Sequence, residues 1–324
     1  MGFFVHLSGN LLFKQVSPDT DQRLRSLLQK AVRRGYASLA WRVALDLQQQ
    51  GDRAWLRQRI PVIVYEECWP LASNIEFPLK LPDAFRHLAK VARSEKAKDA
   101  AGLGSLAYAY SQGDTSIQAE PGIDSQALRT VAKGIEEPEK FWAWLEPQCE
   151  RENQSIFVSI TRQAHRKGGW PWDRAFMLAA AFLAVNDSFP EIKTSTEKPS
   201  EEFPYWIALD KHTLDGKNAI RQAAEAFNLP VNQLMWASFY CESALTNECI
   251  DSPWWNVERR WRLGKAGLTI DHAHTVWEKV QLYIEKILAE QAERLRTAYI
   301  DNDNDPGAPW NREDPPTSRQ LTLF

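Results

Sequence analysis

The sequence predicts an all-α protein built as a multi-helix bundle. Apolar residues recur at intervals of three and four through most of the 324 residues, and this spacing is typical of the buried face of an amphipathic helix. Alternating strand patterns beside hairpin turns are nearly absent, apart from a weak candidate near the N-terminus. With 44% hydrophobic and 25% charged residues, the chain has enough apolar material for one large core or two smaller ones.

The first part of the chain, residues 1–190, is predicted to be a helical domain. Within 21–50 the apolar stripe is interrupted at Gly35, so two helices are expected there. Arg53–Cys68 indicates a third helix, which Pro61 either kinks or divides. Further helices are predicted from Pro82 onward and at Ser125–Lys133, Glu139–Cys149, Gln154–Arg166 and Asp173–Val185, with a loop at Gly113–Asp124.

A second helical part is predicted at 203–299, after a polar and proline-bearing connection at Asp187–Pro204. Its expected helices are Ile207–Leu245 and Ile270–Tyr299. The following segment, 300–319, is acidic, rich in proline and nearly free of aliphatic residues, so it cannot bury enough surface to offset its ordering entropy. We therefore expect a disordered C-terminal tail, in which 300–319 is a flexible linker to the peptide 320–324.

Charge and cysteine usage narrow the function classes. The net charge of -3 gives no long-range attraction for nucleic acid, so any DNA contact requires a local basic patch. No signal peptide and no membrane-spanning stretch is recognised. The cysteines show no CxxC spacing, which favours free thiols in a reducing, cytoplasmic location; they are Cys68, Cys149, Cys241 and Cys249.

The sequence ends in QLTLF, which places three large apolar side chains in the last five residues. Gln320 can donate and accept hydrogen bonds at the mouth of a pocket, while Leu321 fits a small apolar site and Leu323 with Phe324 fills a deeper one. QLTLF resembles the clamp-binding motif of bacterial replication and repair proteins, whose pattern is Gln-Leu-x-Leu-Phe. The resemblance implies that the partner is the β sliding clamp, the processivity factor of DNA polymerase III. The alternative is that Leu323 and Phe324 pack onto the helical body.

A second resemblance covers residues 30–72. This segment is similar to the helical domain that follows the ATPase module in the replication-associated recombination protein A family, whose members are clamp-loader relatives. Ala40–Leu47 matches the first helix of that domain, Gly51-Asp52 the turn and Leu56–Glu67 the second helix, while Cys68-Trp69 departs from it. No GxxxxGK[ST] phosphate loop accompanies it. The resemblance thus implies a clamp-loader-collar-like body without ATP hydrolysis.

Two segments, HRKGGWPWDR and PWWNVERRWRLGK, combine cationic side chains with indoles. Cations can contact phosphates while indoles stack on exposed bases, which is the chemistry of single-strand and fork binding. The alternative is that most of the fourteen tryptophans are core residues and that the arginines only solvate helix faces. The residues predicted to contact DNA are Arg166, Lys167, Trp170, Trp172, Trp254, Trp255, Arg259, Arg260, Arg262 and Lys265.

Three polar segments raise the question of catalysis. Glu66 and Glu67 are adjacent on a predicted helix and point about 100° apart, which favours a surface or capping role. In DHAH, Asp271 is expected to cap a helix, and the two histidines do not share a helix face. No catalytic residue, metal ion or cofactor is therefore predicted. An enzymatic alternative would use the closely spaced polar residues Asp210, His212 and Asp215.

Together these patterns predict a non-enzymatic accessory protein of bacterial DNA replication or repair. It would be cytoplasmic, associated with the nucleoid when bound to the β sliding clamp, and would contact DNA but no membrane. Two alternatives stay open. One is a hydrolytic or nuclease-like enzyme, and the other is a phage or mobile-element protein that hijacks the host clamp.

Overall fold

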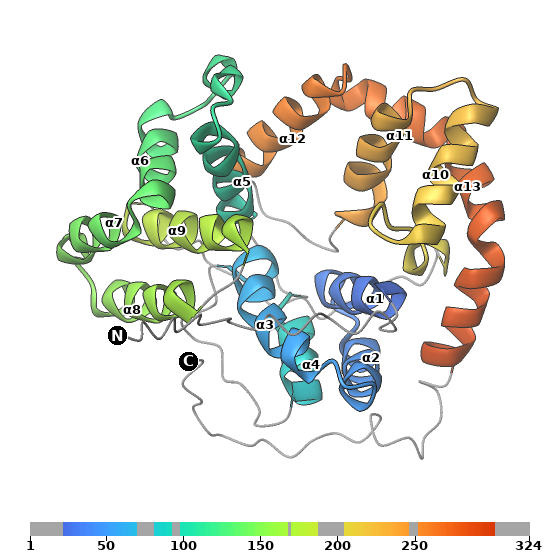
Figure 1. Cartoon of the computed structure of the whole chain (residues 1–324), viewed down its shortest axis with the longest axis horizontal. Helices are drawn as coiled ribbons and strands as arrows, with labels where there is room; N and C mark the ends of the chain where they lie inside the picture. The colour runs from blue at the N-terminus through green and yellow to red at the C-terminus, as the bar shows by residue number, and fades with distance from the viewer. Residues whose placement is uncertain are drawn as a thin grey trace, which may run out of the picture.

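The structure is a computed structural model that describes residues 22–69, 81–92, 98–167, 170–186, 204–245 and 252–301. These residues form helices joined by turns and include no β-strand, which confirms the predicted all-α class (Figure 1). The α-helices are α1 (Gln22–Arg33), α2 (Ala37–Gln49), α3 (Arg53–Glu67), α4 (Leu81–Ala92), α5 (Asp99–Ser111), α6 (Ser125–Glu136), α7 (Pro138–Leu145), α8 (Glu152–Lys167), α9 (Pro171–Asn186), α10 (Leu214–Ala226), α11 (Val231–Ser238), α12 (Pro253–Lys265) and α13 (Ile270–Tyr299).

Most helix boundaries in the first part follow local signals. Gly35 has a φ of 77° after the end of α1, a conformation that glycine adopts without the steric cost of a side chain. Helix α3 continues through Pro61, so the proline does not divide it. The loop predicted at 113–124 contains a short 3₁₀ helix, η2 (Thr115–Ala119).

The predicted single helical run at 207–245 is wrong. It is split into η4 (Pro204–Ile207), α10, α11 and a π-helical turn, η5 (Phe239–Ser243). Thr213 begins α10, because its side chain accepts a hydrogen bond from the backbone N–H of Gly216 at 3.2 Å. Asn228, with a φ of 50°, and the following Pro230 separate α10 from α11.

The N-cap of α13 also differs from the prediction. The side chain of Thr269 accepts a hydrogen bond of 3.1 Å from the backbone N–H of His272, so Thr269 is the cap. Asp271 lies inside the first turn. Thr269 has the extended backbone that a cap requires, whereas Asp271 is already helical and instead meets the positive end of the helix dipole.

Helices from distant parts of the sequence pack together around the centre of the molecule. Helix α5 packs against α6, α9 and α12, while α2 packs against α1 and α4, and α13 packs against η4, α10 and α11. One continuous hydrophobic core cluster contains residues from all of these α-helices. In Figure 1, α1–α4 and α10–α13 lie on two sides of a centre that α5 and α9 border from a third side.

Two glycines let α5 approach its neighbours closely. A Cβ atom on Gly102 would overlap the backbone of Trp254 in α12, and one on Gly104 would lie 2.7 Å from the ring of Phe176 in α9. A glycine inside a helix lowers stability by about 1 kcal/mol relative to alanine. Glycine is nevertheless favoured at these two positions, because a larger side chain would overlap the neighbouring helix. The contact fixes the start of α12, including Trp255, beside α5.

Several predicted features lie outside the described residues. These are the weak N-terminal strand, the connection at 187–203, most of the predicted linker 300–319 and the peptide 320–324. In the part of the chain that is described, no helix combines the length and the apolar character needed to cross a membrane.

Candidate functional site

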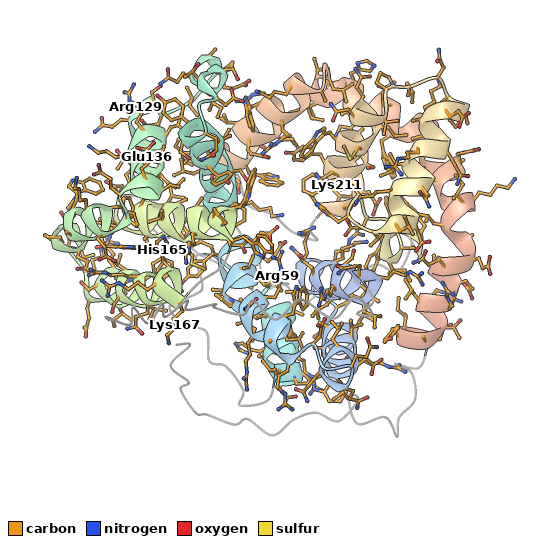
Figure 2. All side chains as sticks on the ribbon, in the orientation of Figure 1. Arg59, Arg129, Glu136, His165, Lys167 and Lys211 are labelled. Carbon is orange, nitrogen blue, oxygen red and sulfur yellow. The ribbon has the colours of Figure 1, made fainter. Side chains whose placement is uncertain are left out.

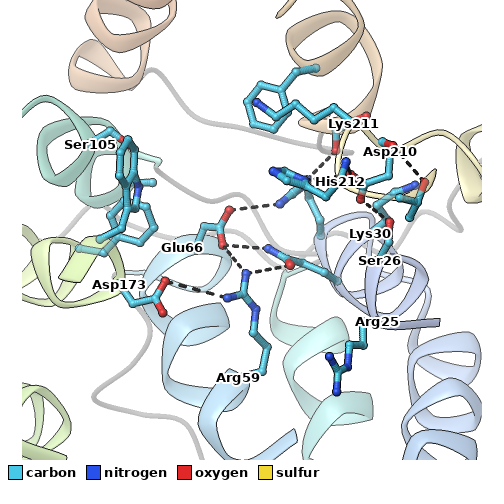
Figure 3. Close-up of a pocket in the computed structure, with 18 of the residues that line it drawn as sticks. Arg25, Ser26, Lys30, Arg59, Glu66, Ser105, Asp173, Asp210, Lys211 and His212 are labelled. Carbon is cyan, nitrogen blue, oxygen red and sulfur yellow. Dashed lines mark hydrogen bonds and ion pairs between the residues drawn. The ribbon is translucent and has the colours of Figure 1, made fainter. Parts of the chain in front are cut away.

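A pocket of about 490 Å³ lies where α1, α3, α5, α9, α11, α12 and the turn 210–213 meet. We call it the central pocket. Its volume is within the range of small-molecule binding sites. Figure 3 shows Ser26, Lys30, Asp210 and His212 gathered on one side and Ser105 on the other. The site is therefore assembled from segments that are almost two hundred residues apart in the sequence.

Aromatic side chains form much of the pocket wall. All but one of them are only half-buried, so their rings remain partly accessible. Accessible indole and phenyl rings offer flat surfaces on which a planar ligand can stack. The aromatic residues that line the pocket are Trp55, Trp172, Phe176, Trp236, Phe239 and Trp255.

The charged lining contains more cations than acids. Several of the cations have a carboxylate partner; for example, Arg25 forms two hydrogen bonds of 2.6 Å with Asp52. Arg33 likewise pairs with Glu67 behind the wall, so these two cations are neutralised, and the charge available to a ligand is local to the cations without such a partner. The cationic residues are Arg25, Lys30, Arg33, Arg59, Lys211 and Arg262, and the acidic residues are Glu66, Asp173, Asp210 and Glu258.

Lys211 and Arg262 contact one common aromatic ring. Nζ of Lys211 lies 3.5 Å from the ring centroid of Trp236 and 4.1 Å from that of Phe239. Cζ of Arg262 lies 5.0 Å from the Trp236 centroid, and its Nε is 3.3 Å from Glu258. Burial, followed by the charge of Arg262, lowers the pKa of Lys211 to about 8. The positive charges of Lys211 and Arg262 thus lie close to each other at the wall of the pocket.

Asp210 organises the turn that carries Lys211. Its Oδ1 accepts a hydrogen bond of 2.7 Å from the backbone N–H of His212 and lies 2.9 Å from Nδ1 of that histidine. Its Oδ2 accepts a hydrogen bond from the hydroxyl of Ser26. Burial alone would raise the pKa of Asp210, but the hydrogen bond from His212 and the charge of Lys30 outweigh it, so the pKa lies well below its usual range.

A buried ionic network lies beneath the pocket. Glu67 is fully buried and forms an ion pair with Arg33, while Nζ of Lys98 lies 3.6 Å from its Oε2. Nη2 of Arg33 also lies 3.1 Å from Oε1 of Glu66. The predicted surface or capping role of these two glutamates is therefore wrong. Cations from α1 and from the start of α5 supply charges that make burial of the carboxylates tolerable.

Lys30 and Arg34 join α1 to the C-terminal helices. Nζ of Lys30 donates hydrogen bonds to the carbonyl oxygens of Trp206, at 2.9 Å, and of Leu209. Burial lowers the pKa of Lys30 to about 8. Nη2 of Arg34 donates to the carboxylate of Glu242 and, at 2.9 Å, to its carbonyl oxygen. The bonds of Lys30 hold the segment just before the turn 210–213 against α1, and those of Arg34 hold η5 beside the end of α1.

The π-helical turn η5 forms another part of the wall. Phe239 and Ser243 line the pocket, and the carbonyl oxygen of Ser243 accepts a hydrogen bond of 2.5 Å from Arg33. A π-helical turn inserted after an α-helix is rare and is found frequently at functional sites. Here the turn directs the carbonyl of Ser243 toward Arg33 at the end of α1, while Phe239 packs against Trp236.

Three of the ten residues predicted to contact DNA come together in this pocket. Trp172, Trp255 and Arg262 line it, although they belong to two different sequence clusters. Cζ of Arg262 lies 5.3 Å from the ring centroid of Trp172, and the ring of Trp172 lies 4.9 Å from that of Tyr108. The two sequence segments are therefore in contact through those of their side chains that line the pocket.

The surface cations of the same clusters are engaged elsewhere. Nη2 of Arg166 lies 2.8 Å from Oε2 of Glu139, and Lys265 forms an ion pair with Asp114. Arg260 donates a hydrogen bond of 2.7 Å to a backbone carbonyl. These cations are directed toward neighbouring protein groups and do not form one common phosphate-binding face.

The other predicted residues are also separated from the pocket. Trp170 is 75% exposed, and Lys167 lies at the periphery in Figure 2, whereas Lys211 points toward the centre. The backbone N–H of Trp254 donates a hydrogen bond of 2.8 Å to Asp99, and Arg259 is half-buried on α12. The sequence pattern alone did not distinguish these residues from their neighbours in the pocket.

Sequence reasoning did not identify Lys211, Trp236 or Trp55 as site residues. A signal was present for Lys211, because it lies between Asp210 and His212, which were considered for another role. Asp215, the third member of that set, instead forms an ion pair of 2.9 Å with Arg23 and does not line the pocket. No group of three or more metal-ligating side chains that could hold a metal ion occurs among the described residues.

The central pocket combines aromatic rings with cationic and acidic side chains. Aromatic rings can stack on a planar group, while paired cations can neutralise a negative one. Comparisons with known proteins add no family to this description: no protein-family model matches the chain, and neither the curated proteins nor the solved structures gave a significant match.

Proposed function

We propose that this protein is a non-enzymatic accessory factor of DNA replication or repair that is recruited to the β sliding clamp. The observation that carries the proposal is the pentapeptide QLTLF at 320–324. It contains each fixed position of the clamp-binding pattern, and a composition typical of a tether precedes it. A tethered peptide can occupy a partner pocket while the helical body acts on DNA nearby.

We further propose that the helical body contacts DNA through the central pocket. Trp172, Trp255 and Arg262 support this role, since they combine stacking surfaces with a cation in one cavity. The collar-like resemblance at 30–72 belongs to the same proposal. The helical pair α2 and α3, joined at Gly51 with a φ of 94°, supports it because the resemblance expects two helices joined by a glycine turn.

Calorimetry with the purified sliding clamp tests the recruitment. The intact chain should bind with a dissociation constant of roughly micromolar order, as expected for one short peptide in a preformed pocket. A chain lacking Leu323 and Phe324 should show no binding. Thr322→Ala is the matched control and should bind like the intact chain, because this position is expected to face solvent. Absence of binding by the intact chain would show that QLTLF is a coincidence.

A second candidate function is hydrolytic or nuclease-like catalysis. One contact favours it: Nδ1 of His212 lies 2.9 Å from Asp210, which would leave Nε2 available as a general base. The hydroxyl of Ser26 donates to Asp210 and not to His212, so a Ser-His-Asp triad is not formed. Turnover of a DNA or phosphoester substrate that is lost in His212→Ala would support this candidate over the non-enzymatic one.

A further inference from the structure

We propose that the central pocket binds one phosphorylated nucleoside, with its phosphate against Lys211 and Arg262 and its base among the indoles of Trp172 and Trp255. The ligand is either a free nucleotide or an unpaired nucleotide of a DNA strand, which share this chemistry. The inference deepens the DNA-contact part of the proposed function and rests on that part. It is independent of clamp docking.

The phosphate subsite is placed at the lining cations whose charge is not fully compensated by carboxylate partners. Arg25 is matched by Asp52 through two hydrogen bonds, and Arg33 is matched by buried glutamates. Lys211 instead rests on aromatic rings, and in the described chain no carboxylate lies within ion-pair distance of its ammonium group. An anion placed there would relieve its repulsion with Arg262.

The carboxylate nearest to Arg262 is already shared. Glu258 lies 3.3 Å from Nε of Arg262, and its other oxygen accepts a hydrogen bond of 2.5 Å from Tyr240. Glu258, with Asp210 beside Lys211, thus compensates part of the charge of the two neighbouring cations, and a bound anion would compensate the rest. A phosphate group, with several acceptor oxygens and a negative charge, matches both the guanidinium and the ammonium group.

The base subsite follows from the two half-buried indoles. Trp172 and Trp255 line the same pocket as the two cations. Each indole is supported by a further group, since Tyr108 lies 4.9 Å from the ring of Trp172 and Nζ of Lys98 lies 4.6 Å from that of Trp255. A supported ring keeps its orientation, so a base can stack on it with little loss of side-chain freedom.

The volume of the pocket fits a single nucleotide. About 490 Å³ suits a molecule of small-ligand size and does not admit a base-paired duplex. A DNA strand would therefore have to present an unstacked, unpaired nucleotide, as enzymes that extrude a base require. Polar groups of Ser105, Gln29 and Asp173 also line the pocket and can form hydrogen bonds with the edge of a base.

Calorimetry on the full chain without the clamp tests this proposal. The probes are deoxyadenosine monophosphate and triphosphate, deoxyadenosine without phosphate, inorganic phosphate, a short oligodeoxythymidylate and the same oligonucleotide in a duplex. A phosphorylated nucleoside or the single strand should bind, and deoxyadenosine should bind at least about tenfold more weakly, since it lacks charge-assisted hydrogen bonds. Binding by the single strand alone identifies a strand as the source, whereas binding by free nucleotides alone identifies a small molecule.

Paired variants locate the binding in the pocket. Lys211→Gln and Arg262→Gln should each weaken binding about tenfold or more. Their matched controls are Lys265→Gln and Arg260→Gln, which alter cations that are engaged outside the pocket. The controls should bind like the intact chain. The melting temperature of each variant shows whether it is folded. If Lys211→Gln does not fold, the binding measured for Arg262→Gln tests the phosphate subsite.

The tryptophans form a second matched pair. Trp172→Phe retains a smaller ring and should weaken binding of the nucleotide while leaving binding of inorganic phosphate unchanged. Trp170→Ala, two residues away and 75% exposed, should have no effect. The proposal is overturned if no probe binds, if deoxyadenosine binds as tightly as its phosphate, or if the surface variants weaken binding and the pocket variants do not. None of these outcomes depends on the clamp experiment.

Proton uptake gives a signature that a purely structural role of Lys211 would not produce. The groups that face its ammonium are Arg262 and Glu258 from α12, and Asp210 beside it. With a pKa of about 8, Lys211 is half protonated at that pH, and a bound phosphate favours the charged form. Binding near pH 8 should therefore take up protons, which isothermal calorimetry in two buffers of different ionisation enthalpy measures. Lys211→Gln should reduce that uptake and leave only the contribution of other lining groups such as Lys30, whose pKa is also about 8. Uptake of equal size in this variant would contradict the assignment.

Discussion

Replacing Glu67 with glutamine tests whether the ionic network beneath the pocket holds the two halves of the site together. The Glu67 side chain is 0% exposed and that of its partner Arg33 only 6%, while Lys98, at 2% exposure, lies 3.6 Å away. After the change, Arg33 retains its contact with Glu66, while Lys98 loses the carboxylate that lies 3.6 Å from its ammonium group. Removing one member of a buried ion pair costs about 3–5 kcal/mol, because the charge that remains is uncompensated.

This loss should be visible in thermal unfolding. A change of 1 kcal/mol shifts the melting temperature of a large domain by about 2 °C or more, so Glu67→Gln should lower it by about 6–10 °C. Circular dichroism or calorimetry at pH 7 measures this shift. The matched control is Glu139→Gln, which breaks a surface pair with Arg162 and Arg166 and should leave the melting temperature within about 1 °C.

A double variant separates the ionic interaction from general disturbance of the core. Changing both Glu67 and Arg33 should cost less than the sum of the two single changes, since neither member of the Glu67–Arg33 pair is then left behind as a charge that the other compensated. If Glu67→Gln melts within about 2 °C of the intact chain, the carboxylate does not compensate the buried cations. The reasoning on the network would then be refuted.

Three further predictions concern backbone and charge. Gly102→Ala should destabilise the protein by about 1–3 kcal/mol through overlap with α12, whereas Gly264→Ala, with open space around it, should stabilise it by about 0.5–1 kcal/mol; urea unfolding compares the two. Asp210 has a lowered pKa, so it contributes stability above its unfolded pKa of about 4 and loses that contribution as the pH falls below it. The free energy of unfolding of Asp210→Asn should therefore lie further below that of the intact chain at pH 7 than at pH 3. An equal difference at the two pH values would contradict this sign. Thr269→Ala should lower the free energy of unfolding by about 1 kcal/mol and Asp271→Ala by less, and thermal melts measure both losses. A larger loss for Asp271→Ala would indicate that Asp271 is the N-cap.

Clamp docking and nucleotide binding together would give the protein two attachments of different kinds. The peptide 320–324 would determine where the protein is held, and the central pocket would determine what it recognises there. Because a tether raises the effective concentration of the body near DNA, even weak nucleotide binding in the pocket would be used efficiently. The two experiments can succeed or fail separately, so each part of this scheme has its own test.

Much of the helical content was predictable because helix periodicity and end signals are local. The expected helix Ile270–Tyr299 and the observed α13 have identical bounds, and Gly35 separates two helices as its position indicated. Helix α12 was not predicted as an element, since its tryptophans and arginines do not form a simple apolar stripe. The π-helical turn was also not predicted, because its extra residue is stabilised by contacts with α1 from far away in the sequence.

The sequence by itself determined the helical class, most helix positions and the presence of the QLTLF peptide, since these depend on neighbouring residues only. The tertiary structure decided which side chains share a site. Trp170 and Trp172 are two residues apart, yet one is 75% exposed and the other lines the central pocket. Trp170 lies just before α9, whereas Trp172 lies in its first turn. Packing of α9 against α5 and of α5 against α12 brings Arg262 to 5.3 Å from the ring centroid of Trp172. Long-range packing, which no local pattern encodes, therefore created the pocket.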